Sequence, residues 1–353
     1  MKVVFVSNYL SHHQKPLCDA LAARTEFAFL QTERMSSERL AMGWQQDYPA
    51  YVTEDTSALA EADVVIAGSA PERLIRPCIL QGKLVFRYHE RPLKDGKPWW
   101  KWAVRYGKWH WRNPTSKNLW LLCAGGYVAA DYARFGLFRG RALKWGYFPE
   151  AGMPAQKEQG MLLWAGRLVS WKHPEAAVAV AANLKEAGYD FHLNILGTGP
   201  MAQALREQIA RAGLQEQVRL CGAMAPEKVR ERMGAAAIYL FTSGREEGWG
   251  AVLSEAMSCG CAVVANRAAG ATPYLVRHGY NGLCYETEEE LYRQVKCLLD
   301  DSKMGAELGR EARKTVAEVW NGEVAARRLV AFSEKILSGE EPQFWPDGPC
   351  SKA

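Results

Sequence analysis

The chain has 353 residues, of which 48% are hydrophobic and 24% charged, and its formal net charge is +5. This composition is typical of a soluble globular protein and excludes a disordered chain, while the length suits two domains. No apolar run reaches the roughly 18 residues of a membrane-spanning helix, and the start MKVVFVSN predicts a buried strand in place of a signal peptide. We therefore expect a cytoplasmic protein.

Cysteines and histidines lack the spacings of disulfide frameworks and metal sites. There are nine cysteines, an odd number, without a Cys-x-x-Cys pair, and seven histidines without a His-x-x-x-His pair. We predict reduced cysteines in the core and no metal site.

Positive charge is concentrated in the first half. Residues 1–150 hold 21 Lys and Arg against 14 Asp and Glu, and residues 83–117 alone hold ten basic residues against Glu90 and Asp95. A partner or surface with negative charge is expected to meet this segment.

Along the first half, short apolar runs alternate with amphipathic stretches such as 16–24. The apolar runs predict strands at 2–8, 27–31, 62–69, 83–89 and 119–125. This alternation is typical of βαβ units on a parallel sheet. The segment Gly146–Gly160, which has two prolines and many polar residues, interrupts the pattern and is predicted to be the interdomain linker.

A second series of the same kind follows the linker. Strands are predicted at 161–168, 191–197, 218–222, 237–243 and 261–266, with helices at 174–188, 200–213, 225–236 and 250–260 between them. Two doubly wound domains in tandem are therefore expected, with ligands binding at the carboxyl ends of the strands. A last helix around 326–337 is expected to pack back across the junction.

The phrase LGTGPMA, residues 196–202, follows a predicted strand and opens a predicted helix. It matches the Gly-x-Gly-x-x-Ala pattern of dinucleotide sites, but the next strand ends in Cys221 and Gly222, where an NAD site places an acidic residue. A glycine turn that lets the chain enter a helix is favoured, and NAD binding stays open as an alternative.

Two further motifs place charged residues in the loops that follow predicted strands. WAGRLVSWKHPE places Arg167 just after a strand and Lys172 just before a helix, which is typical of a diphosphate site without a metal ion. REEGWGAVLSEAMSCG places Glu247 in a glycine loop and Glu255 one turn into a helix. A glycosidase pair needs carboxyl groups about 5 Å apart, which a loop and the following turn disfavour, so these glutamates are predicted to hold a ligand.

Together, GRL and Lys172, LGTGP, VRLCG, EGWGAVLSEAMSCGCAVVA and GYNGLCY resemble the retaining nucleotide-sugar glycosyltransferases of the family 4 type. The resemblance covers most of residues 160–325. It implies a GT-B fold, with two Rossmann-like domains facing across a cleft: an acceptor-binding domain over 1–148, joined by a C-terminal helix of about 325–353, and a nucleotide-sugar-binding domain over 155–324.

The resemblance also implies roles for the residues of these motifs. Arg167 and Lys172 would bind the donor diphosphate, Glu255 the ribose hydroxyls and Glu247 the donor sugar, without metal or cofactor. The residues so implied to bind the donor are Gly166, Arg167, Lys172, Gly197, Gly199, Gly222, Met224, Glu247, Gly248, Trp249, Gly250, Ala251, Val252 and Glu255.

The N-terminal half matches that family in pattern only. Its first loop, SNYLSHHQKP, lacks the family's glycine pair, and His12 and His13 are candidates for the acceptor side. The run FRYHER ends a predicted strand where related enzymes place a histidine near the reacting sugar. His89 is the candidate catalytic group there, with Glu90 as its substitute.

The segment PWWKWAVRYGKWHWRN, residues 98–113, predicts a helix with a basic stripe. Lys101, Arg105, Lys108 and Arg112 share one face, and Trp99, Trp102, Tyr106 and Trp109 occupy the other. Such a helix suits the interface of an anionic membrane, and the alternative is that the aromatic face is packed into the core. Contact with a membrane or a lipid-linked acceptor is favoured, because the surplus of positive charge is concentrated in this segment.

These observations predict a retaining glycosyltransferase that moves a sugar from a nucleotide-sugar donor, with UDP the commonest donor nucleotide of the family, to a glycan or lipid-linked acceptor. We expect a cytoplasmic protein that can sit peripherally on the inner face of the plasma membrane, and no nucleic-acid partner. A nucleotide-sugar 2-epimerase of the same fold, an NAD-dependent oxidoreductase and a non-catalytic nucleotide-sugar sensor are the alternatives. The base, sugar, acceptor and linkage are left open by the sequence.

Overall fold

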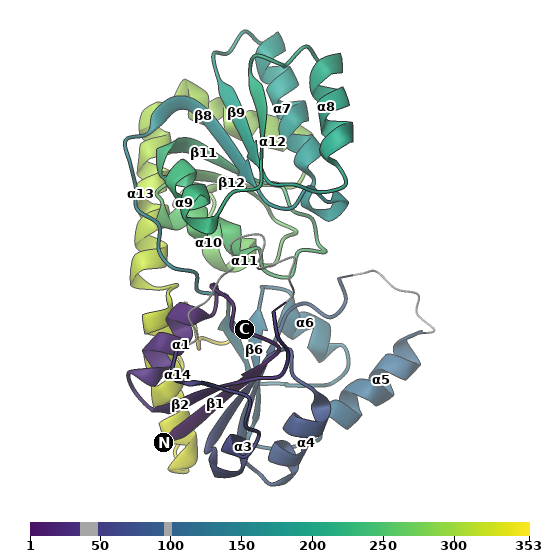
Figure 1. Ribbon diagram of the computed structural model, residues 1–353, viewed down its shortest axis with the longest axis vertical. Coiled ribbons are helices and arrows are strands. Elements are labelled where there is room, and N and C mark those ends of the chain that lie inside the picture. The colour runs from purple at the N-terminus through teal and green to yellow at the C-terminus, as the bar shows by residue number, and fades with distance from the viewer. Residues whose placement is uncertain (36–48, 95–100) are drawn as a thin grey trace. The chain divides into compact units, whose positions relative to one another are not determined.

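The computed structural model describes residues 1–35, 49–94 and 101–353, with the backbone alone at 101–103. These residues form two compact units (Figure 1). Among the described residues, unit 1 holds 1–35, 49–94, 101–149 and 319–353, and unit 2 holds 150–318. The chain therefore returns from unit 2 to unit 1 for residues 319–353.

Unit 1 is built on a parallel sheet, with strand order β3-β2-β1-β4-β5-β6-β7 over the described residues. Its strands are β1 (Lys2–Ser7), β2 (Glu26–Gln31), β3 (Val52–Thr53), β4 (Val64–Ala67), β5 (Leu84–His89), β6 (Leu119–Ala124) and β7 (Ala142–Trp145). The helices are α1 (Lys15–Ala22), α3 (Ala58–Glu61), α4 (Glu72–Leu80), α5 (Lys101–Arg112), α6 (Val128–Ala133) and α14 (Gly322–Leu337).

Unit 2 has a second parallel sheet, of order β10-β9-β8-β11-β12-β13. Its strands are β8 (Glu158–Ala165), β9 (His192–Leu196), β10 (Val218–Gly222), β11 (Ala236–Phe241), β12 (Ala262–Asn266) and β13 (Leu283–Tyr285). The helices are η1 (Ser170–Lys172), α7 (Pro174–Glu186), α8 (Ala202–Arg211), α9 (Pro226–Ala235), α10 (Ala251–Ser258), α11 (Thr272–Leu275), α12 (Glu288–Asp300) and α13 (Ser302–Glu318).

Both units confirm the predicted class of parallel α/β sheet. Every residue of the central strands β4 and β6 is buried, which explains why these strands are continuous apolar runs. In each sheet the strand order reverses its direction beside the first strand of the unit, as in doubly wound folds. All nine cysteines are free, and most are buried, as predicted.

The C-terminal segment differs from the sequence prediction. α14 packs against α1, but it ends at Leu337, whereas the sequence analysis extended this helix to about residue 353. Gly339 takes a left-handed φ of 78°, which ends the helix. Residues 350–353 instead run along β7, where Cys350 N–H donates to Lys144 O at 3.0 Å and Ala353 N–H donates to Ala142 O at 3.1 Å.

Two glycines of α13, one helical turn apart, have opposite surroundings. A Cβ added at Gly309 would lie 2.3 Å from Gly260 O, whereas one at Gly305 would meet nothing closer than 3.9 Å. At Gly309 the backbone of the helix therefore packs directly on the backbone of the loop before β12, and a side chain there would separate the two.

We expect Gly309→Ala to destabilise the protein by about 1–3 kcal/mol, because the methyl group overlaps a backbone oxygen that has little freedom to move. Gly305→Ala is the matched control, and it should be neutral or stabilise by about 0.5–1 kcal/mol through helix propensity. Thermal melting of the two variants checks this. Equal melting temperatures would contradict the close packing at Gly309.

Candidate functional site

The loop after β8 carries the two predicted cations. Arg167 is exposed, and its guanidinium carbon lies 5.6 Å from the centre of the Trp171 ring. η1 ends at Lys172 and is followed by His173, whose φ of 46° and ψ of 51° are left-handed. Because non-glycine residues seldom adopt this conformation, the surroundings must hold this turn between η1 and α7.

Lys172 and Glu247 form an ion pair although 75 residues separate them. Lys172 Nζ contacts Glu247 Oε2, and the two side chains are only 12% and 16% exposed. The same carboxylate oxygen accepts a hydrogen bond of 3.1 Å from Ser243 Oγ. Since little water screens this pair, each partner holds the other in position more firmly than a surface pair would. An incoming anion would therefore meet a cation that is already oriented.

The ends of β8 and β11 are tied to η1 by neutral hydrogen bonds. Thr242 Oγ1 donates to Lys172 O at 2.6 Å and accepts from Trp164 Nε1 at 2.8 Å. Gly244 N–H donates to Trp171 O at 2.8 Å. These bonds fix the backbone on both sides of the Lys172–Glu247 pair.

Glycines in the loop from β11 to α10 allow very close approaches. A Cβ at Gly250, where φ is 91°, would lie 2.4 Å from a ring atom of Phe241. A Cβ at Gly270 would lie 1.7 Å from Gly248 O, which brings the loop after β12 against this one. The glycines are therefore required by packing, whatever the loops bind.

The glycine turns after β8, β9 and β10 lie together. A Cβ at Gly197 would lie 1.8 Å from Gly166 O, and Gly197 N–H donates to Gly222 O at 2.7 Å. A Cβ at Gly199 would lie 2.4 Å from Leu168 O. These contacts explain the glycines of LGTGPMA by loop packing, without a bound dinucleotide. Met224, half-buried, follows the last of these turns.

Helix α10 begins at Ala251, and the N–H groups of its first turn, including that of Val252, have no acceptor within the helix. Glu255 lies one turn further and is only 5% exposed. Burial raises the pKa of its carboxyl group to about 7, against a smaller opposing effect of Arg230. Trp249 is buried and lies near the ring of Tyr274, so its side chain belongs to the core of the loop.

The candidate residues of unit 1 lie in two small groups. His89 ends β5, and its Nδ1 lies 2.5 Å from Tyr132 Oη. Glu90 accepts a hydrogen bond of 3.1 Å from Tyr147 Oη. The ring of Tyr147 lies 6.4 Å from that of His13, whose own ring lies 3.8 Å from that of His12. Tyr147 therefore links Glu90 to the loop after β1.

The predicted basic helix is present as α5, but its faces differ from the prediction. Trp109 packs on Phe135 and Tyr132, with ring centres 4.3 and 5.1 Å apart, so it belongs to the core, whereas Tyr106 is 52% exposed. The alternative of core packing therefore holds for Trp109, whose position is covered by α6 and the turn after it, and not for Tyr106. Residues 98–100, with Trp99, and the side chains of Lys101 and Trp102 lie outside the described part.

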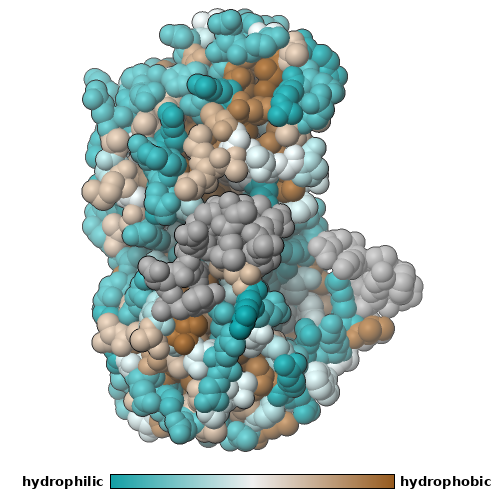
Figure 2. All heavy atoms as spheres, in the orientation of Figure 1, coloured by the Kyte–Doolittle hydropathy of each residue, from teal (hydrophilic) through white to brown (hydrophobic). Residues whose placement is uncertain are grey.

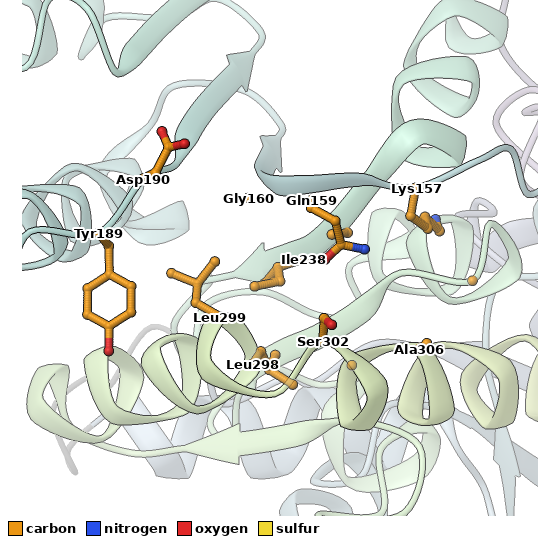
Figure 3. A pocket seen from close by; sticks show the side chains of 13 residues that line it. Lys157, Gln159, Gly160, Tyr189, Asp190, Ile238, Leu298, Leu299, Ser302 and Ala306 are labelled. Atoms are coloured by element: carbon orange, nitrogen blue, oxygen red, sulfur yellow. The ribbon is translucent and has the colours of Figure 1, made fainter.

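A cavity of about 260 Å³ lies elsewhere in unit 2 (Figure 3). It is formed by the residues around the starts of β8 and β11 and by the junction of α12 and α13, and its lining includes Lys157, Tyr189, Ile238, Leu298 and Ser302. The candidate residues of this unit lie at the opposite, carboxyl ends of the strands, so the cavity is separate from them.

Three residues next to the predicted cations were missed by the sequence analysis. They are Ser243, which bonds to Glu247; Thr242, which bonds to the backbone of Lys172; and Trp171, which faces Arg167. A signal was present for the first two, since polar residues directly after a buried strand lie at the ligand edge of a parallel sheet.

We expect the raised pKa of Glu255 to make stability depend on pH. The folded state binds the proton more tightly than the unfolded state, so the buried carboxylate lowers stability increasingly from about pH 4.5 to pH 7, and constantly above that. Glu255→Gln should therefore raise the melting temperature relative to the wild type at pH 8, by the equivalent of about 3 kcal/mol, and much less at pH 5. Melting curves from pH 5 to 8 measure this. A difference that stays constant with pH would show that the carboxyl group is not shifted.

Residues 151–315 match the family model described as Glycosyl transferases group 1. The 2-deoxystreptamine glucosyltransferase of Streptomyces kanamyceticus is 29% identical over 206 residues, covering 54% of this chain and 49% of its own length. The amylovoran biosynthesis glycosyltransferase AmsK of Erwinia amylovora is 28% identical over 182 residues, covering 50% of this chain and 44% of its own length. The chain thus spans about half the length of these curated relatives.

Among solved structures, Anabaena HepE in complex with UDP superposes with a TM-score of 0.71 at 16% identity, covering 96% of this chain and all of that one. At this identity the likeness shows the fold. The two parallel-sheet units have the GT-B architecture, and within unit 2 residues 151–315 are similar to the glycosyl transferases group 1 family.

Proposed function

We propose that this chain is a retaining glycosyltransferase that transfers a sugar from a nucleotide-sugar donor, preferentially a UDP-sugar, to a glycan or a lipid-linked glycan in the synthesis of a cell-surface polysaccharide or glycolipid. The observation that carries the proposal is the Lys172–Glu247 ion pair beside Arg167, at the ligand edge of a glycosyl transferases group 1 domain. The polysaccharide enzyme of Erwinia and the UDP complex from Anabaena support the acceptor class and the donor nucleotide.

Each charged residue has a task in this proposal. Arg167 and Lys172 bind the diphosphate and offset the negative charge that grows as the nucleoside diphosphate leaves, so no divalent cation is required. The N–H groups at the start of α10 add donors for phosphate or sugar oxygens. Glu247 orients the donor sugar, and Glu255 accepts hydrogen bonds from the ribose hydroxyls.

The residues of unit 1 act on the sugar and acceptor side of the reaction. His89 contacts the reacting sugar from the end of β5. Glu90, His12 and His13, which Tyr147 brings near one another, belong to the acceptor side. In this proposal unit 2 binds the donor and unit 1 serves the acceptor side. In each unit the candidate residues lie at the ends of strands and in the loops that follow them.

A 2-epimerase of the same fold is the second enzyme to consider, and it would convert the donor sugar without any acceptor. An NAD-dependent oxidoreductase is less supported, because loop packing accounts for Gly197 and Gly199. Incubation with the donor alone distinguishes the epimerase by its product, and calorimetry with NAD tests the oxidoreductase.

Arg167→Ala and Glu247→Ala should each lower the rate of sugar transfer by about 10²–10³-fold, because each removes a charged group that acts on the donor. Calorimetry with UDP and a panel of other nucleotides first identifies the base, and transfer is then measured with the matching sugar donors in the presence of EDTA. Arg206→Ala, an exposed cation of α8, is the matched control and should leave the rate unchanged. Full activity of both site variants would refute the assigned roles.

The proposal includes contact of segment 98–113 with an anionic membrane, as suits a lipid-linked acceptor. On α5, Val104, Lys108 and Trp111 are exposed at spacings of four and three, with Val104 74% and Trp111 53% exposed. The Arg76 guanidinium from α4 lies 5.0 Å from the Trp111 ring centre, so basic groups flank the apolar ones. In Figure 2, hydrophobic atoms stand at the surface in the area that α5 occupies in Figure 1.

Trp111→Glu should weaken binding to vesicles of phosphatidylglycerol and phosphatidylcholine by about tenfold or more, because it replaces an apolar side chain by an acidic one. Leu337→Glu, at an exposed apolar position elsewhere in unit 1, is the control and should bind as the wild type does. Co-sedimentation with vesicles measures the binding of both variants. Vesicles of pure phosphatidylcholine should bind the wild type less than the mixed, anionic vesicles do. No described helix is long and apolar enough to span a bilayer. If Trp111→Glu binds the vesicles as the wild type does, the exposed face of α5 is not the membrane contact.

A further inference from the structure

His89 and Tyr132 form a hydrogen-bonded pair inside unit 1. Their rings stack with centres 5.8 Å apart and planes 23° apart, and His89 Nδ1 lies 2.5 Å from Tyr132 Oη. Tyr132 comes from α6 and is only 4% exposed, whereas the His89 ring is half-buried. The two residues are 43 positions apart, so the pair exists only in the folded chain.

Either His89 Nδ1 or the Tyr132 hydroxyl can be the donor in this hydrogen bond. The two arrangements differ in whether the hydroxyl proton of Tyr132 has an acceptor. If Nδ1 carried the proton and donated it, the Tyr132 hydroxyl would need another acceptor for its own proton, and the described residues supply none. If the hydroxyl donates to an unprotonated Nδ1, both groups are satisfied. A buried donor without a partner is costly enough to favour the second arrangement roughly tenfold or more.

The charges around the ring disfavour its doubly protonated form. Arg87 is buried and forms a bidentate ion pair with Glu72, at 3.1 and 2.8 Å, and Arg112 lies 3.5 Å from the same carboxylate. Burial and then the cations Arg87 and Arg112 lower the pKa of His89 to about 3. The ring is therefore neutral over the range in which an ordinary histidine titrates.

We propose that Tyr132 is a positioning residue that fixes His89 in the tautomer with its proton on Nε2, so that the ring offers a hydrogen-bond donor to a ligand oxygen. The His89 side chain is half-buried and its Nδ1 faces Tyr132, so Nε2 is the ring nitrogen left for a ligand. The nature of that ligand, a sugar hydroxyl, rests on the proposed function, but the tautomer does not. In this state His89 cannot act as a cationic acid, and it orients and polarises an oxygen instead.

The test is two-bond ¹H–¹⁵N correlation NMR of the full chain labelled with ¹⁵N-histidine, without donor or acceptor. His89→Gln identifies the His89 signals among those of the seven histidines. In the wild type we expect a pyridine-type Nδ1 and a pyrrole-type Nε2, unchanged from pH 8 to pH 5.5. A proton on Nδ1, or titration near pH 6.5, would overturn the proposal.

Tyr132→Phe removes only the hydroxyl, and it should shift the His89 signals toward an average of the two tautomers. Tyr88→Phe is the matched control, because Tyr88 is a buried tyrosine of the same unit that donates to Gly146 O at 2.8 Å. Removal of the Tyr88 hydroxyl should leave the His89 tautomer unchanged. An unchanged tautomer in Tyr132→Phe would also refute the assignment.

Kinetics then separates this proposal from the proposed function. If the chain transfers sugars, Tyr132→Phe should lower kcat by about tenfold at nearly constant KM, whereas Tyr88→Phe should not. A failure to find any transferase activity would sink the proposed function and leave the NMR result standing. Wild-type kcat in a Tyr132→Phe protein whose tautomer has changed would show that the hydroxyl does not serve catalysis.

Discussion

At the carboxyl edge of the second sheet, neighbouring loops pack main chain against main chain, so closely that only glycine fits at the contacts. The turn at Gly197 lies on Gly166, and the loop after β12 lies on Gly248 through Gly270. Because these loops touch through main-chain atoms, the residues between them have little freedom to move. Lys172 and Glu247 can therefore form a mostly buried ion pair from distant parts of the sequence. Electrostatic groups act best on a reaction when they are held in place beforehand, and here the packing of glycines supplies that rigidity.

The two units use different chemistry at corresponding places. The second sheet presents charged side chains and the N-terminus of α10, which suit the phosphates of a donor. The first presents histidines and tyrosines, of which His89 is kept neutral by burial and by cations paired with Glu72. Glu255 is the converse case, a carboxyl group whose burial raises its pKa toward neutrality. At neutral pH the raised pKa of Glu255 lowers the stability of the fold, whereas the lowered pKa of His89 does so only below about pH 6.5. Shifted groups of this kind cluster at functional sites, which agrees with a role of both residues in binding.

Much of the fold follows from the sequence because its central strands are buried on both faces and appear as apolar runs. β3 and β7 are not evident in this way: β3 has two residues, and β7 (ALKW) alternates buried and half-buried positions. Among candidate site residues, glycines and charges at strand ends could be found by spacing. Trp109 could not be placed, since a helical pattern does not tell which face another helix covers. Tyr132 was missed because it meets His89 only when α6 packs on the sheet in the folded chain, and no local pattern encodes that contact.

The return of α14 to unit 1 has a consequence for the order in which the chain folds during synthesis. The described part of unit 2 is the continuous segment 150–318, so the contacts within it can form once residue 318 has left the ribosome. Unit 1 must wait for residues 319–353, and Gly322 then has to reach the backbone of Pro16 and Leu17 so closely that a Cβ would lie 2.7 Å from it. At roughly 5–20 residues per second, α1 would keep its apolar face uncovered for many seconds. The first unit to be made would thus be the last to be completed.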